Sequence, residues 1–151
     1  MVPSPTPETK VFRQPHIVRF ADVDAAGIVY YPRLLHYCHL TFEDFFPAAG
    51  EKTYAQWIQT ERIGFPTVHL DVDFRVPVEF GKELVMAATV TRIGQKSVTF
   101  RFRGERPDGT ICFQADVTKA CAGMDTGKSQ PIPDELRQLF GEYLTAEESA
   151  G

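Results

Sequence analysis

Hydrophobic and polar positions recur along this chain with two different periods, and the periods divide it into predicted strands and helices. The clearest alternation lies in Thr67–Val76, where a period of two predicts a strand. Val68 and Leu70 begin its apolar face, which we expect to meet a core, whereas Thr67 begins its polar face. Similar patterns predict four more strands. These are Val11–Phe20, Leu84–Ile93, Ser97–Arg103 and Ile111–Ala122.

A helical period replaces the alternation between the first and second predicted strands. Pro32 suits the first helical turn, because a missing N–H leaves nothing unsatisfied there. From Leu34 to Phe46 the apolar residues recur at helical spacing, and they form a wide apolar face. We therefore predict a central helix of about 15 residues, which ends at Pro47 and Gly50.

Two further helices are shorter. Thr53 and Gln56 have the spacing of a capping box at the start of a short helix, and Pro131–Leu144 has the pattern of a terminal helix. One strand, one long apolar helix and then four strands at hairpin spacing indicate an α+β domain, in which an antiparallel sheet wraps around the helix. We assign this domain to residues 11–144, with flexible segments at 1–10 and 145–151.

Composition restricts the partners and the compartment. The 151 residues carry a net charge of −4, which argues against broad nucleic-acid binding. No apolar run is long enough to span a membrane, and the first ten residues contain three prolines and no apolar block, so we expect no signal peptide. Cys38, Cys112 and Cys121 lie among apolar neighbours, which is typical of reduced core cysteines in a cytoplasmic protein.

Two acids stand in the loop that precedes the long helix. The start of a helix offers free N–H groups and the positive end of its dipole, which can stabilise an oxyanion. A carboxylate beside it can attack a carbonyl carbon or activate a water. Asp22 and Asp24 are therefore candidates for catalysis, and Gly27 would let a ligand approach the backbone. The alternative is that either acid merely caps the turn or the helix.

The sequence shows no metal-binding or nucleophile motif that would suggest a different active site. His36 and His39 lie three residues apart on the predicted helix, but no third ligand accompanies them, so packing or surface roles are favoured. The chain contains no G-x-S-x-G, P-loop or G-x-G-x-x-G motif. We therefore expect no metal and no bound cofactor.

The stretch Phe20–Pro32, with the pattern F-x-D-x-D-x-x-G-I-V-Y-Y-P, resembles the opening motif of the 4-hydroxybenzoyl-CoA thioesterase family of hotdog-fold proteins. Gly64–Val68 and Gly94–Ser97 also fall where that family places such segments. The resemblance covers roughly residues 12–140 and implies the hotdog fold, a sheet wrapped around one long helix.

The resemblance also implies a role for individual residues. Asp24 falls on the catalytic carboxylate, as nucleophile or general base, and Tyr31 on the residue whose backbone N–H binds the thioester oxygen. Asp22 and Gly27 fall on supporting positions. The substrate-binding positions are Phe65, Pro66 and Thr67 for the acyl pocket, and Lys96 and Ser97 for the CoA phosphates.

The implied activity is hydrolysis of an acyl-CoA to a free acid and CoA by a homodimer or homotetramer. The acyl group is either aromatic, such as benzoyl or 4-hydroxybenzoyl, or a short-to-medium aliphatic chain. A thioesterase for acyl carrier protein and a non-catalytic acyl-CoA binding protein remain alternatives. Lys96 is the one cation at the CoA turn, so Arg92, Arg101 and Arg103 either assist it or form a solvated strand face.

Overall fold

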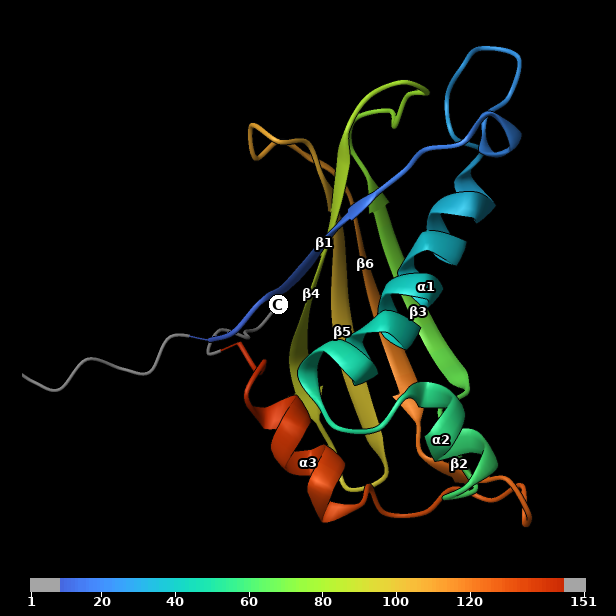
Figure 1. Ribbon diagram of the computed structural model, residues 1–151, viewed down its shortest axis with the longest axis vertical. Coiled ribbons are helices and arrows are strands. Elements are labelled where there is room, and N and C mark those ends of the chain that lie inside the picture. Colours follow the sequence, from blue (N-terminus) through green and yellow to red (C-terminus); the bar gives the residue numbers. More distant parts are fainter. Residues whose placement is uncertain (1–8, 146–151) are drawn as a thin grey trace, which may run out of the picture.

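The computed structural model describes residues 9–145 and contains one curved antiparallel sheet (Figure 1). Its strand order is β1-β4-β5-β6-β3, and a second sheet pairs β2 with β7. The strands are β1 (Phe12–His16), β2 (Ile63–Gly64), β3 (Thr67–Phe74), β4 (Leu84–Ile93), β5 (Ser97–Glu105), β6 (Ile111–Ala120) and β7 (Ala122–Gly123). All five predicted strands are therefore present, and β4 has the predicted bounds.

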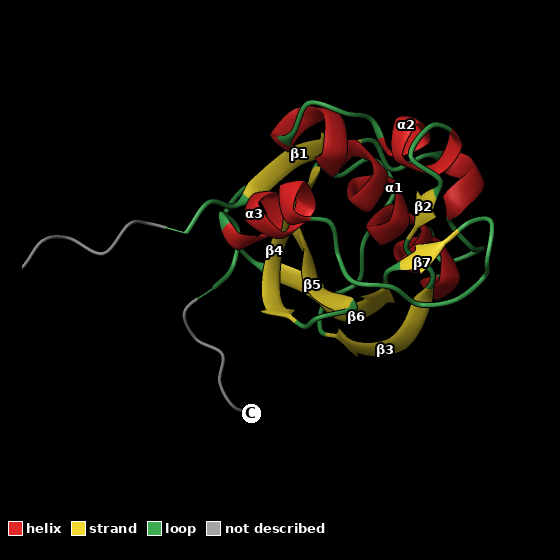
Figure 2. Ribbon diagram, turned by 90° about the horizontal axis from the view of Figure 1, so that it is seen from below, coloured by secondary structure: helices red, strands yellow, loops and turns green. Residues whose placement is uncertain are grey.

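The helix α1 (Tyr31–Ala49) lies in the concave side of the sheet, as the end-on view in Figure 2 shows. It has 19 residues and continues through Pro47 to its cap at Gly50, so the prediction that Pro47 ends it was wrong. A proline in the last turn removes only one hydrogen bond, and Gly50 N still donates to the carbonyl of Phe46 at 2.9 Å. Two shorter helices follow, α2 (Tyr54–Gln59) and α3 (Asp134–Gly141).

Aromatic side chains form the contact between α1 and the sheet. Phe42, Phe45 and Phe46 are fully buried, and the rings of Phe42 and Phe45 each lie 5.3 Å from that of Phe100 on β5, edge to face. Burying one such side chain stabilises the fold by about 1.5–3 kcal/mol. The predicted central helix and its apolar face are thus confirmed, and the three cysteines are free and buried.

Strand β1 is shorter than predicted because the chain leaves the sheet early. It ends at His16, residues 17–19 leave the sheet without regular structure, and a 3₁₀ turn follows at Phe20–Asp22. In that turn the Arg19 N–H donates to the Asp22 carboxylate at 3.3 Å. The local hydrogen bond competes with strand pairing, as short acidic side chains commonly do.

Strand β3 departs most from its prediction. Val68, Leu70 and Phe74 are 61%, 42% and 52% exposed, because β3 is the edge strand next to β6 and α1 lies closer to β4 and β1. A register shift between Thr67 and His69 also places Thr67 with Leu70 beside α1, where both line one cavity. Within residues 9–145 the apolar face of β3 is therefore only partly covered: Val72 packs against the core, whereas Leu70 and Phe74 stay largely exposed.

The ends of the described chain lie beside each other. Lys10 N donates to the carbonyl of Glu142 at 3.2 Å, and Thr145 N donates to that of Val90 at 2.8 Å. The predicted flexible segments otherwise fall on residues 1–8 and 146–151, outside the described residues. Within the described part of the chain, no helix has the length and hydrophobicity needed to cross a membrane.

Candidate active site

A tight hairpin between β1 and α1 carries the two predicted acids. Tyr30 N donates to the Asp22 carbonyl at 3.0 Å, and Asp24 N donates to the Ile28 carbonyl at 2.9 Å. Gly27 closes the turn with φ of +77°, a conformation that favours glycine. This backbone requirement accounts for Gly27 as a supporting residue.

Asp24 is exposed at the tip of the hairpin. Its Oδ1 accepts hydrogen bonds from Ala26 N at 2.9 Å and Ile28 N at 3.4 Å, so the carboxylate does stabilise the turn. Among the described residues its Oδ2 accepts none. One carboxylate oxygen is therefore fixed by the loop and the other remains available to a substrate or a water.

The start of α1 supplies an amide close in sequence to Asp24. Tyr31 is the first residue of the helix and Pro32, the second, has no N–H. Arg33 N donates to the Tyr30 carbonyl at 2.8 Å. The N–H of Tyr31 has no intrahelical acceptor and makes no hydrogen bond within residues 9–145, so it can stabilise a negative oxygen.

Asp22 has a structural role behind this loop. Its side chain is 15% exposed, and its Oδ2 accepts a hydrogen bond of 2.6 Å from the Tyr37 hydroxyl. Burial and this carboxylate raise the pKa of Tyr37 above its ordinary range, which keeps the hydroxyl protonated as a donor. The His16 ring packs on Tyr37 at 3.8 Å between centroids. This network ties the hairpin to both β1 and α1.

An apolar groove opens beside the helix start. It has a volume of about 250 Å³ and is lined by Ile28, Tyr31 and Leu34 on one side and by residues 74–78 on the other. Tyr31 and Phe74 are more than half exposed, and their rings lie 6.2 Å apart. Exposed aromatic side chains of this kind commonly mark a ligand or partner surface.

The predicted substrate-binding residues lie at the other end of the molecule. Tyr31 begins α1, whereas Phe65 N donates to the Tyr54 hydroxyl beyond the helix C-terminus. The 19 residues of α1 span about 28 Å. Phe65 is buried in the core, while Pro66 and Thr67 are exposed. Within one subunit the structure therefore does not bring the two predicted halves of the site together.

The predicted CoA turn joins β4 to β5 at that second end. Lys96 is exposed and Ser97 is half-buried. The guanidinium of Arg137 on α3 donates to the carbonyls of Gly94 and Gln95 at 3.1 and 3.0 Å. This contact could not be predicted from the sequence, because no local pattern relates α3 to a turn more than forty residues earlier.

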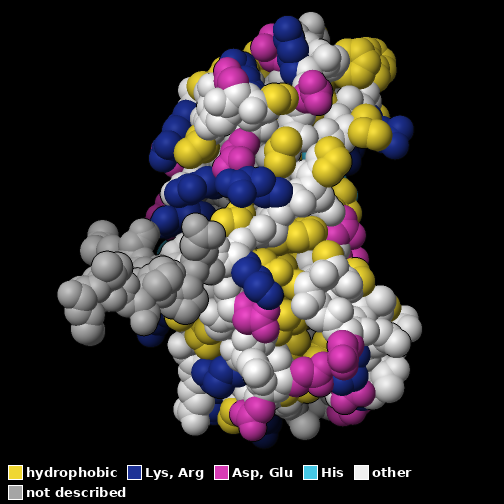
Figure 3. All heavy atoms as spheres, turned by 60° about the vertical axis from the view of Figure 1, so that its left-hand side comes forward, with side chains coloured by type: hydrophobic (Ala, Val, Ile, Leu, Met, Phe, Trp, Pro, Cys, Tyr) yellow, Lys and Arg dark blue, Asp and Glu magenta, His cyan; other side chains and the backbone are white. Residues whose placement is uncertain are grey.

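The other candidate cations lie on the convex face of the sheet. Arg101 pairs with Asp116 at 2.8 Å and Arg103 donates to Gln114 at 2.9 Å, while Arg92 is exposed. Acidic and basic side chains are interspersed on the face shown in Figure 3. Among residues 9–145 no three His, Cys, Asp or Glu side chains are grouped to hold a metal ion.

Sequence reasoning also missed Lys119. It continues the inward-facing row of β6 two residues after Val117, opposite Val98 of β5, and it is only 5% exposed. The signal was present in the alternation of Ile111–Ala122, where a lysine occupies a position reserved for apolar residues.

Comparison with known proteins identifies the family and the fold of the chain. Residues 18–140 match the thioesterase-like superfamily. The 1,4-dihydroxy-2-naphthoyl-CoA hydrolase of Synechococcus elongatus is 27% identical over 121 residues, which cover 80% of this chain and 88% of that protein.

Two solved structures have the same fold. A thioesterase superfamily protein from Jannaschia sp. CCS1 is 31% identical with a TM-score of 0.84, covering 97% of this chain and 99% of that one. An Asp-to-Asn variant of 4-hydroxybenzoyl-CoA thioesterase, complexed with 4-hydroxybenzoyl-CoA, is 22% identical with a TM-score of 0.76, covering 85% and 97%. The chain thus belongs to the thioesterase-like superfamily, and it is a thioester hydrolase with the hotdog fold.

Proposed function

We propose that the protein hydrolyses an acyl-CoA thioester to a free acid and CoA, with Asp24 as the reacting carboxylate. The observation that carries this proposal is the short segment from Asp24 to Tyr31. Among the described residues this segment presents a carboxylate oxygen that accepts no hydrogen bond and a helix-start amide that has no acceptor, beside an apolar groove of about 250 Å³.

The two groups suit the chemistry of a thioester carbonyl. The Tyr31 N–H stabilises the negative charge that develops on the carbonyl oxygen. Asp24 either attacks the carbonyl carbon, expelling CoA thiolate and leaving an anhydride for water to cleave, or takes a proton from an attacking water. Both routes consume one water and release one carboxylic acid and one CoA.

An aromatic acyl group is supported by the groove and by the relatives. Tyr31 and Phe74 offer exposed rings at its wall. The similar proteins named above act on 1,4-dihydroxy-2-naphthoyl-CoA and bind 4-hydroxybenzoyl-CoA. We assign an aryl-CoA as the substrate class for this chain.

A dimer would unite the divided site. β3 is the edge of the sheet, with exposed apolar side chains, and a free edge of this kind pairs readily with a second copy. Antiparallel pairing of two β3 strands places Phe74 of one subunit beside the Thr67 end of its partner. The Asp24 and Tyr31 of one subunit then meet the Phe65–Thr67 segment of the other.

Analytical sedimentation tests the proposed dimer. We expect a dimer or tetramer at micromolar concentration and a smaller particle after Leu70→Asp, which puts a charge on the β3 face. A wild-type monomer at that concentration would contradict this pairing.

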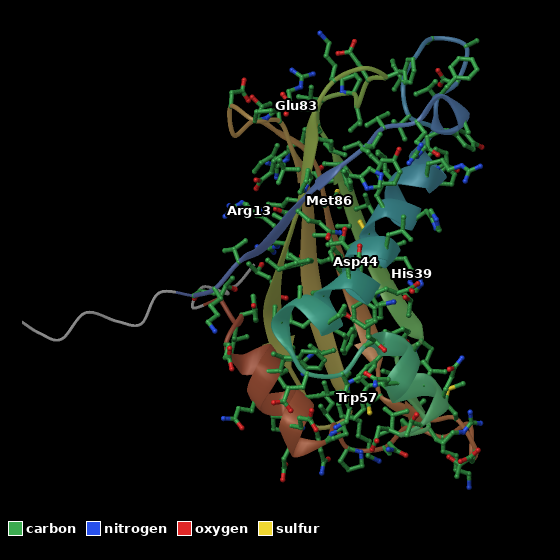
Figure 4. The ribbon with its side chains drawn as sticks, in the orientation of Figure 1. Arg13, His39, Asp44, Trp57, Glu83 and Met86 are labelled. Carbon is green, nitrogen blue, oxygen red and sulfur yellow. The ribbon has the colours of Figure 1, made fainter. Side chains whose placement is uncertain are left out.

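Asp24→Asn tests the catalytic assignment. Asparagine keeps the size and the hydrogen-bond acceptor of the turn but lacks the charge, so kcat on benzoyl-CoA should fall at least about a hundredfold. Asp44→Asn is the matched control, since Asp44 is an exposed acid farther along α1 (Figure 4). Thiol release at a near-normal rate by Asp24→Asn would reject the proposal.

A further inference from the structure

Lys119 is a buried cation to which the described part of the chain offers no hydrogen-bond or ion-pair partner. Its side chain projects from the inner face of β6, and the residue is 5% exposed. Its Nζ lies 4.4 Å from the centre of the Phe42 ring, and within residues 9–145 it makes no hydrogen bond or ion pair. A buried ammonium in this state has lost its water without gaining an acceptor, so it has capacity for an oxygen that the chain does not provide.

The neighbouring groups do not supply that oxygen. Burial raises the pKa of the Cys38 thiol to about 12, so it stays neutral. Glu43 acts on Lys119 electrostatically, but its carboxylate lies 2.6 Å from the His39 ring nitrogen. Figure 4 shows His39 on α1, and the cavity lining places it on the flank beside β3.

Lys119 lines a small cavity between α1 and the strands β3 and β6. The cavity has a volume of about 100 Å³. Its walls are mainly apolar, with Leu35 and Cys38 from α1 and Leu70, Phe102 and Val117 from the sheet. A cavity of about 150 Å³ holds a whole benzene molecule, so this smaller one takes only the outer edge of a ring, and the rest of the ring lies in its open side.

The cavity lies at the predicted acyl end of the site. Thr67, the last residue of the predicted acyl-pocket segment, forms part of its wall. In the dimer proposed above, the partner subunit's Asp24 and Tyr31 reach this end of β3. A thioester whose carbonyl is held there directs its acyl group toward Lys119.

We propose that this cavity receives the hydroxyl-bearing edge of the ring of an aryl-CoA and that Lys119 donates a hydrogen bond to the hydroxyl oxygen on that edge. This inference rests on the proposed function. It makes Lys119 a specificity-determining residue: a hydroxylated ring supplies the missing acceptor, whereas an unsubstituted ring leaves the ammonium unsatisfied. Such sites discriminate against analogues that lack the polar group.

Lys119→Met is the informative variant, because it keeps the length of the side chain and removes its donor. The values of kcat/KM are measured for benzoyl-CoA and the three hydroxybenzoyl-CoA isomers with the full chain. We expect the wild type to prefer at least one isomer over benzoyl-CoA, and the variant to lose that preference by tenfold or more. Comparing both proteins on the same substrates cancels the electronic effect of the hydroxyl group on the thioester.

Binding provides a readout that does not need turnover. Thioether analogues, in which a methylene group separates sulfur from the carbonyl, are titrated calorimetrically with both proteins. The hydroxylated analogue should bind the wild type at least tenfold more tightly than the unsubstituted one, and this difference should shrink in Lys119→Met. Lys128→Met, an exposed lysine away from the cavity, should keep the wild-type ratio.

Each outcome separates the two proposals. Equal ratios in wild type and Lys119→Met, with hydrolysis intact, overturn the role of Lys119 and leave the thioesterase standing. A binding preference without turnover supports Lys119 and rejects the hydrolase mechanism. A drop in dimer stability with unchanged ratios identifies Lys119 as a structural interface residue and overturns the inference.

Discussion

Removing the Tyr37 hydroxyl tests whether the network behind the hairpin positions the catalytic loop. In Tyr37→Phe the Asp22 carboxylate loses its shortest hydrogen bond, 2.6 Å from the phenol oxygen. It keeps the Arg19 N–H at 3.3 Å and the Arg33 guanidinium at 4.0 Å. The ring itself stays, so packing on His16 is preserved.

The expected loss of stability follows from the charge and burial of the Asp22 carboxylate, which accepts this hydrogen bond. A hydrogen bond to a charged group contributes about 1.5–3 kcal/mol, and Asp22 retains two weaker partners, so we take the lower half of that range. For a chain of 151 residues this lowers Tm by roughly 3–8 °C. Because Asp22 holds Tyr30 N through its own carbonyl, a shifted hairpin displaces Asp24 from the Tyr31 amide. We therefore expect kcat to fall about tenfold or more.

Calorimetry and steady-state hydrolysis of benzoyl-CoA measure the two effects. Tyr143→Phe removes the same hydroxyl from a buried tyrosine whose oxygen makes no hydrogen bond within the described residues, and it should change neither quantity. An unchanged Tm and kcat in Tyr37→Phe, or an equal loss in Tyr143→Phe, would refute the positioning role of this network.

Three further predictions follow from single contacts. Arg137→Met removes two hydrogen bonds to the β4–β5 turn, so KM for the CoA ester should rise several-fold while kcat stays within about twofold. A change confined to kcat would contradict a role of Arg137 at that turn. In Gly104→Ala the new Cβ would lie 2.2 Å from the buried Phe113 ring, so unfolding by urea should show a loss of about 1–3 kcal/mol; Gly141→Ala, with open space around it, should show none. Burial lowers the pKa of His16 from its ordinary value of 6.5, so the imidazole binds a proton more readily in the unfolded chain than in the folded one. The free energy of unfolding should therefore fall as the pH drops below about 6.5. His16→Phe should weaken this pH dependence, which is measured as Tm between pH 7 and pH 5.

Structural features that depend on neighbouring residues along the chain could be predicted from the sequence. Leu84–Ile93 is a largely apolar run that pairs with β1 on one side and β5 on the other, and its predicted bounds match β4. The capping box of Thr53 and Gln56 depends on residues three positions apart, and the structure confirms it.

Structural features that depend on contacts between residues far apart in the sequence could not be predicted from it. The alternation of Thr67–Val76 indicates an apolar face but not that β3 is an edge strand, which α1 covers only in part. The bulge that turns Thr67 inward depends on pairing with Lys119. The division of the site residues between two ends follows from the length of α1, which a linear motif does not show.

That division has a genetic consequence. In a dimer with shared sites, an Asp24→Asn subunit and a subunit with its acyl cavity blocked, for example by Thr67→Trp, each form inactive homodimers. In a mixed dimer both lesions fall in the same site, and the other site is assembled from two intact halves. Random mixing by two-fold symmetry restores about a quarter of the sites. Two null alleles of this one gene would therefore complement each other.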